Sequence, residues 1–102
     1  MPLYRLRFHP AFIDELQTAI SYYEEQSKTV GKRFRSATKK QLYLIKKTPL
    51  IKSICYDDIR FARINGFPYA IHYSIDTPGH QVLVHTIVSD HQNPDEYWRK
   101  RL

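Results

Sequence analysis

Apolar residues in the first half of the chain recur at two different spacings. Residues 3–9, LYRLRFH, place most of their apolar side chains at every second position, which is typical of a half-buried strand. From Ala11 to about Ser27, and again from Val30 to Ile45, apolar residues recur three or four positions apart, which predicts two amphipathic helices. Because only residues 27–29 separate them, we expect an antiparallel helical hairpin.

The second half of the chain predicts three strands in succession. They are DDIRFARI (57–64), FPYAIHYSID (67–76) and HQVLVHTIV (80–88), separated by the turn-forming residues Asn65-Gly66 and Thr77-Pro78-Gly79. The predicted order is β-α-α-β-β-β, followed by a short C-terminal helix. We therefore expect an α+β fold in which the helical hairpin packs on a small antiparallel-rich sheet, within one domain covering residues 1–102.

The turn after residue 76 predicts a register for the last two strands. Either a two-residue or a four-residue loop would place His72 opposite His85 and Tyr73 opposite Val84. The face that covers the helices would then carry Tyr69, Ile71, Tyr73 and Ile75 against Val88, Thr86, Val84 and Val82. The predicted core is Phe12, Leu16, Ile20, Tyr23, Phe34, Leu44 and Ile45 packed on Tyr69, Ile71, Tyr73, Val82 and Val84.

The turn at Asn65-Gly66 admits two registers. A two-residue loop would put Arg60 inside the core, so we expect a three-residue loop, Ile64–Gly66, which places Phe61 opposite Tyr69. The far face of the sheet, away from the helices, would then carry Asp58, Arg60, Ala70, His72, Ser74, Leu83, His85 and Ile87.

Two histidines on that far face form the first candidate site. His72 and His85, on neighbouring strands, could share a proton or bind a metal, with Asp58 as the one nearby third ligand. A half-exposed sheet face that tolerates histidine explains the same residues, and we favour that interpretation and expect no metal.

The C-terminal segment SDHQNPDEYWRKR (89–101) is the second candidate site. His91 and Tyr97 could act as acid and base in phosphodiester cleavage, with arginines as charge stabilisers; these arginines are Arg60, Arg63 and Arg99. A capped helix is the simpler explanation of the segment, and we favour it, with Asn93 as the cap, acids in the first turn and Arg99, Lys100 and Arg101 in the last.

Charge and composition narrow the class of partner. The net charge of +6 and pI near 9.6 favour an anionic partner. A single cysteine suits a reducing compartment, and no signal peptide or membrane-length apolar stretch is apparent, so we expect a cytoplasmic protein. The chain has no glycine-rich phosphate loop, CxxC or HExxH sequence, and we expect no cofactor.

Four stretches resemble the RelE/ParE superfamily of type II toxins, nearest to its ParE-like, plasmid-stabilisation branch. They are residues 8–34, 59–76, 82–88 and 93–101, with YYEEQS…G..F and R…FPY.I.Y.ID as their most specific letters. The resemblance covers nearly the whole chain. It implies a helical hairpin on an antiparallel sheet and a cognate antitoxin that wraps the toxin and neutralises it.

The resemblance also implies two possible activities. RelE-like members cleave mRNA on the ribosome, with an arginine expected where this chain has Ala70 and a C-terminal tyrosine matching Tyr97. Characterised ParE-like members are associated with inhibition of DNA gyrase, and their relatives commonly read H..R.P where this chain has Ser89 and Gln92. We expect a gyrase-binding toxin. The alternatives are a metal-independent endoribonuclease or a degenerate copy without toxicity, and the oligomeric state stays open.

In the binding interpretation, basic residues contact the target and no bond is made or broken. The expected target-binding residues are Arg60, Arg63, Arg99, Lys100 and Arg101.

Overall fold

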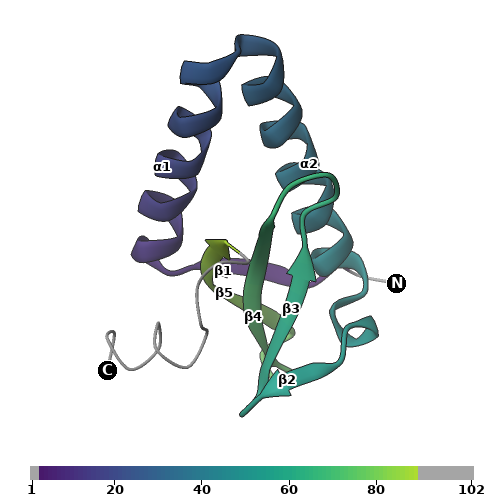
Figure 1. Cartoon of the computed structure of the whole chain (residues 1–102). Coiled ribbons are helices and arrows are strands. Elements are labelled where there is room, and N and C mark those ends of the chain that lie inside the picture. Colours follow the sequence, from purple (N-terminus) through teal and green to yellow (C-terminus); the bar gives the residue numbers. More distant parts are fainter. Residues whose placement is uncertain (1–2, 90–102) are drawn as a thin grey trace.

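The computed structural model describes residues 3–89, which form two helices and a five-stranded sheet. The elements are β1 (Arg5–Phe8), α1 (Pro10–Gln26), α2 (Lys28–Lys47), a 3₁₀ turn η1 (Pro49–Ile51), β2 (Ile54–Tyr56), β3 (Ile59–Arg63), β4 (Tyr69–Asp76) and β5 (Gln81–Ser89). The α+β fold and the helical hairpin are confirmed (Figure 1). The predicted C-terminal helix lies outside the described residues.

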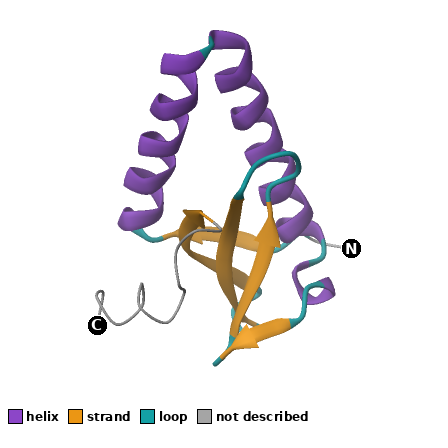
Figure 2. Ribbon diagram, viewed as in Figure 1, coloured by secondary structure: helices purple, strands orange, loops and turns teal. Residues whose placement is uncertain are grey.

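The hairpin between the helices is tighter than predicted, because Ser27 alone separates them. Its extended backbone ends α1, and its hydroxyl accepts a hydrogen bond from the Val30 N–H at 3.4 Å to cap α2. Next to it, Gly31 is buried against Glu24, and a Cβ there would lie 2.4 Å from Glu24 Cγ and 3.2 Å from Glu24 Cα. Glycine thus lets the helices approach at the hairpin, from which they diverge toward the sheet (Figure 2).

The sheet has the strand order β1-β5-β4-β3-β2. β1 runs parallel to β5, and every other pair of neighbours is antiparallel. β2 was not predicted, because its three residues, Ile54 to Tyr56, are too few for a periodic pattern. It leaves Asp57 and Asp58 in an exposed turn, where Asp57 adopts a φ of 49°, so Asp58 is not on the sheet face where we expected it.

The β4–β5 hairpin confirms half of the predicted register. Tyr73 pairs with Val84 as expected, and the loop is the four-residue alternative, 77–80. An irregularity next to Tyr73 then adds one residue to β5, so His72 pairs with Thr86 and the predicted pairing with His85 is wrong. Because a bulge of this kind changes the alternation beyond it, Ile87 belongs to the core and not to the far face.

The predicted register of the β3–β4 hairpin is wrong. Beyond the end of β3, the Ile64 N–H still donates a hydrogen bond to the Tyr69 carbonyl at 2.9 Å, which leaves residues 65–68 as the loop. Phe61 pairs with His72 instead of Tyr69. A three-residue loop would have put Pro68 into the ladder between strands, where proline has no N–H to donate. The four-residue loop avoids this, with Gly66 at a φ of 85°, and it places Arg60 opposite Tyr73.

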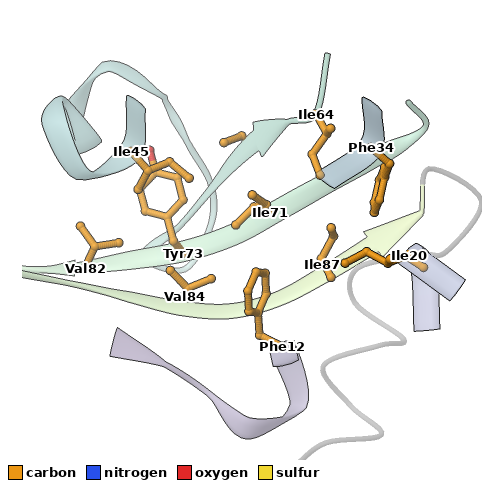
Figure 3. Packing of buried hydrophobic residues seen from close by; sticks show 12 residues of the cluster. Phe12, Ile20, Phe34, Ile45, Ile64, Ile71, Tyr73, Val82, Val84 and Ile87 are labelled. Atoms are coloured by element: carbon orange, nitrogen blue, oxygen red, sulfur yellow. The ribbon is translucent and has the colours of Figure 1, made fainter. Parts of the chain in front are cut away.

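The core lies between the two helices and the helix-facing side of β3, β4 and β5 (Figure 3). The predicted core residues that are fully buried are Phe12, Ile20, Phe34, Ile45, Ile71, Tyr73, Val82 and Val84. Leu16, Tyr23 and Tyr69 pack against this cluster while partly exposed. Leu44 was wrongly assigned, because its side chain is 40% exposed.

Tyr73 joins the core to η1. Its buried hydroxyl donates a hydrogen bond to the Pro49 carbonyl at 2.7 Å. Burial raises the pKa of Tyr73 to about 12, an effect that the nearby Arg60 partly opposes. The phenol therefore remains a protonated donor at physiological pH, and the hydrogen bond fixes the end of α2 against the sheet.

Candidate functional site

The far face of the sheet gathers aromatic and imidazole side chains around His72. The Phe61 ring stacks on the His72 ring with centroids 3.9 Å apart, and the Tyr56 hydroxyl lies 3.3 Å from His72 Nδ1. Nearby, Ser74 Oγ lies 2.7 Å from His85 Nε2. These residues come from β2, β3, β4 and β5, so four strands build this face.

His72 is buried and neutral. Its side chain is 1% exposed, and burial, with a smaller contribution from nearby His85, lowers its pKa from 6.5 to about 4. Its Nε2 atom is buried without a hydrogen-bond partner. With a pKa near 4, the imidazole is neutral at physiological pH and has no acidic proton to transfer. His72 is therefore a structural residue of this face rather than an acid catalyst.

The two histidines do not form the opposed pair that the sequence predicted. His85 is bonded to Ser74 and occupies the irregular part of β5, while His72 pairs with Thr86. In the part of the chain that the structure describes, no group of three or more His, Cys, Asp and Glu side chains could hold a metal ion.

The two candidate arginines of β3 lie on opposite faces of the sheet. Arg60 pairs with Tyr73 on the helix side and donates a hydrogen bond to the Lys52 carbonyl. Arg63 is exposed and pairs with Ala70, which is 5% exposed. Our expectation that Arg60 lies on the far face is therefore wrong, and Arg60 and Arg63 do not converge on one site.

The remaining candidate residues lie outside the described residues. These are His91, Tyr97, Arg99, Lys100 and Arg101. Their roles remain predictions from the sequence.

A strongly cationic surface covers the outer side of α2. The helix carries eight Lys and Arg side chains and no Asp or Glu. Among residues 3–89, one ion pair is formed, between Arg35 and Glu24 at 3.3 Å, and both side chains are about half exposed. Such a surface attracts an anionic partner.

Hollows beside α2 were not predicted. The larger, about 630 Å³, lies between α2 and the β3–β4 loop and includes Gln41, Leu44 and Phe67. The pattern of α2 could have indicated it, because Leu44 lies next to the buried Ile45 at the margin of the apolar stripe. Phe67 gave no such signal, since its place depends on the loop register.

Neither helix in residues 3–89 is both long and apolar enough to cross a membrane.

Two solved structures of other proteins have a fold similar to that of this chain. The isolated RelE toxin of E. coli has a similar structure, with a TM-score of 0.64 and 18% sequence identity, over 97% of this chain and 99% of that chain. The toxin-antitoxin complex RelBE2 of Mycobacterium tuberculosis also contains a similar chain, with a TM-score of 0.61 and 17% identity, over 87% and 93% of the two chains. At these identities the likeness concerns the fold.

A search of curated protein sequences found no match. The family model for the ParE toxin of the type II toxin-antitoxin system parDE matches residues 6–94. The chain therefore belongs to the ParE toxin family of type II toxin-antitoxin systems.

Proposed function

We propose that this chain is a toxin that acts by binding an essential target such as DNA gyrase, and that a cognate antitoxin neutralises it. Family membership supports the toxin class. The choice of binding over catalysis rests on the far face of the sheet.

Ala70 is the observation that carries this choice. It is 5% exposed and pairs with Arg63 on one side and Val88 on the other. The mRNA-cleaving branch is expected to carry an arginine at this position, and a methyl group cannot stabilise charge on a phosphate. The neighbouring His72 is buried and neutral, so it does not replace the missing cation.

The charge of α2 supports an anionic partner. Its eight cationic side chains exceed the net charge of the whole protein, +6. Surfaces of this kind accelerate association with acidic proteins and with nucleoprotein targets. Arg63, Arg99, Lys100 and Arg101 are the basic residues that we propose contact the target; Arg60, which points to the core side, is a weaker candidate.

The alternative activity is ribosome-dependent cleavage of mRNA. The similar structure of the RelE toxin favours keeping it as a second hypothesis. Inducing the protein in a bacterial host and following DNA supercoiling and mRNA integrity in parallel separates the two. We expect growth arrest with altered supercoiling and intact mRNA. Early mRNA cleavage at unchanged supercoiling would contradict the binding mechanism, and unchanged growth would indicate a degenerate copy.

Substitutions near the C-terminus give a second test. We expect His91→Ala and Tyr97→Phe to change the dose needed for growth arrest by less than about threefold, whereas loss of a catalytic acid or base costs about 100-fold or more. Replacing both Arg99 and Arg101 by glutamate is expected to weaken binding to purified gyrase, more strongly at low salt than at high salt. Toxicity that disappears in His91→Ala would favour the nuclease.

Antitoxin binding is the third expected result. The RelBE2 structure is a complex of a toxin with its antitoxin, and the +6 charge of this chain favours an acidic counterpart. We expect the purified protein to co-elute with the product of the adjacent reading frame at low salt, and the complex to weaken as salt is raised. A mixture that elutes as two separate proteins at low salt would remove the main support for the toxin-antitoxin assignment.

A further inference from the structure

An exposed aromatic ring lies within the cationic surface of α2. The Tyr43 side chain is 53% exposed, and all eight charged side chains of the helix are Lys or Arg. Side chains three and four positions apart are neighbours on a helix surface. In both directions from Tyr43 these positions are occupied by lysines, namely Lys39, Lys40, Lys46 and Lys47. We term these five residues the Tyr43 platform.

Packing of the core does not account for the exposed ring. Among residues 3–89, Ile45 belongs to the hydrophobic core and Leu42 packs against it, whereas Tyr43 does neither. A ring surrounded by lysines offers a flat apolar face to a ligand that is itself flat and carries negative charge nearby. Nucleic acids combine these two properties, because each base has a π-face and each phosphate a negative charge.

The larger hollow beside α2 adjoins the platform. It has a volume of about 630 Å³ and lies between α2 and the β3–β4 loop (Figure 1). Lys40 belongs to the platform and also lines the hollow, where Arg63 adds a second cation from β3. No Asp or Glu of residues 3–89 lines this hollow. A cationic surface thus continues from Tyr43 into the hollow.

The hollow also contains an acceptor that the protein leaves without a partner. Gln41 lines the hollow, and its side-chain oxygen is buried without a hydrogen-bond donor among residues 3–89. Buried polar atoms are normally paired. The exocyclic amino groups of adenine, cytosine and guanine are donors of the required kind. A base in the hollow would therefore complete this hydrogen bond.

We propose that the Tyr43 platform and the adjoining hollow bind a short stretch of single-stranded DNA. One base would stack on the Tyr43 ring, and the next would lie in the hollow beside Gln41. The phosphates between them would contact Lys40 and Arg63. Aromatic stacking combined with cations along the backbone is a general means by which proteins hold single strands. The inference rests on the proposed function for the choice of DNA, because DNA gyrase acts on DNA.

Other anionic partners fit this surface less well than a single strand. The bases of a duplex are stacked on one another, so no base face is available to Tyr43. The platform from Lys39 to Lys47 extends roughly 12 Å along the helix axis, which suits a few nucleotides. The carboxylates of an acidic peptide would pair with the lysines, but they would neither stack on Tyr43 nor donate a hydrogen bond to Gln41.

Fluorescence anisotropy of a labelled, mixed-sequence DNA strand of about twelve nucleotides, titrated with the purified full chain, tests this site. Tyr43→Ala removes the stacking ring, and Tyr22→Ala removes a ring of similar exposure, 56%, from α1. We expect Tyr43→Ala to raise the Kd about tenfold or more, while Tyr43→Phe and Tyr22→Ala stay within about twofold of the wild type.

A charge reversal on α2 provides the second comparison. Lys40→Glu alters both the platform and the hollow, whereas Lys32→Glu makes the same change about two helical turns away, at an exposed position outside both. We expect the Kd of Lys40→Glu to exceed that of Lys32→Glu at least about fivefold at low salt, and the difference to shrink as salt is raised. Both variants should melt at the temperature of the wild type, because both positions are exposed.

Equal Kd values for Tyr43→Ala and Tyr22→Ala would mean that charge alone holds the strand and would overturn the inference. Absence of binding at low salt, equal affinity for the matching duplex, or tighter binding of an RNA strand of the same sequence would overturn it as well. None of these results bears on gyrase, whose inhibition is tested by DNA supercoiling in the host. Unchanged supercoiling together with strand binding that depends on Tyr43 would instead reject the proposed target and leave the platform as a DNA site.

Discussion

Replacing Phe34 by alanine is expected to lower the free energy of unfolding by about 3 to 5 kcal/mol. Phe34 is fully buried on α2, and its ring centroid lies 4.9 Å from that of Tyr23, 5.0 Å from Phe67 and 5.5 Å from Tyr69. Alanine would leave a cavity where both helices, the β3–β4 loop and β4 meet. The free energy of unfolding of native proteins is only about 5 to 15 kcal/mol. Urea titration should therefore find that this variant has lost a large part of its stability.

A second substitution on the same helix provides the control. Tyr43 is 53% exposed, so Tyr43→Ala removes a ring of similar size without opening a cavity, and we expect a loss below about 1 kcal/mol. Equal losses in the two variants, or a loss below about 1 kcal/mol in Phe34→Ala, would mean that this cluster does not support the fold.

The helical hairpin could be predicted from the sequence because its signals are local. Phe12, Ile20, Phe34 and Ile45 recur at helical spacing, and each is buried in the structure. A helix forms hydrogen bonds within four residues, so the periodicity of its apolar side chains alone locates its buried face.

Strand registers were less predictable because they depend on single residues far apart in the chain. The irregularity beside Tyr73 shifts every pair from His72–Thr86 to Tyr69–Ser89 by one residue. No glycine or proline in either strand marks its place. The loop before β4 did carry a signal in Pro68, which cannot donate in a ladder. Giving that proline more weight would have excluded the three-residue loop, but not chosen the observed pairing of Phe61 with His72, which also places Arg60 on the core side.

The wrong strand registers also led to wrong predictions about the candidate site. The sequence placed His72 and His85 on one half-exposed face, and the two residues are indeed near enough for His85 to affect the pKa of His72. Burial of His72 was not predictable, because it involves Tyr56 from the unpredicted β2 and Phe61 from the other register. The larger hollow beside α2 was missed for a related reason, since it forms only where α2 meets a loop distant in sequence.

Acidification is expected to destabilise the protein through His72. In the unfolded chain the imidazole is in water with its usual pKa of 6.5, while burial in the folded protein, together with nearby His85, lowers the pKa to about 4. Between these values the unfolded state binds a proton that the folded state does not. Stability is therefore fully present above pH 6.5 and falls as the pH is lowered toward 4, by about 3 kcal/mol in total.

His72→Gln isolates this effect, because glutamine does not titrate. The variant loses the ring that stacks on Phe61 and should be less stable at pH 7, but urea titrations at pH 7, 5.5 and 4.5 should find its stability falling less than that of the wild type. Ile45→Val is the matched control, since it weakens the core by about 1 kcal/mol and keeps the histidine; its stability should fall with pH as steeply as the wild type. Parallel losses in wild type and His72→Gln would mean that other groups, chiefly carboxylates, account for acid sensitivity and that His72 is protonated as easily in the folded protein as in the unfolded chain.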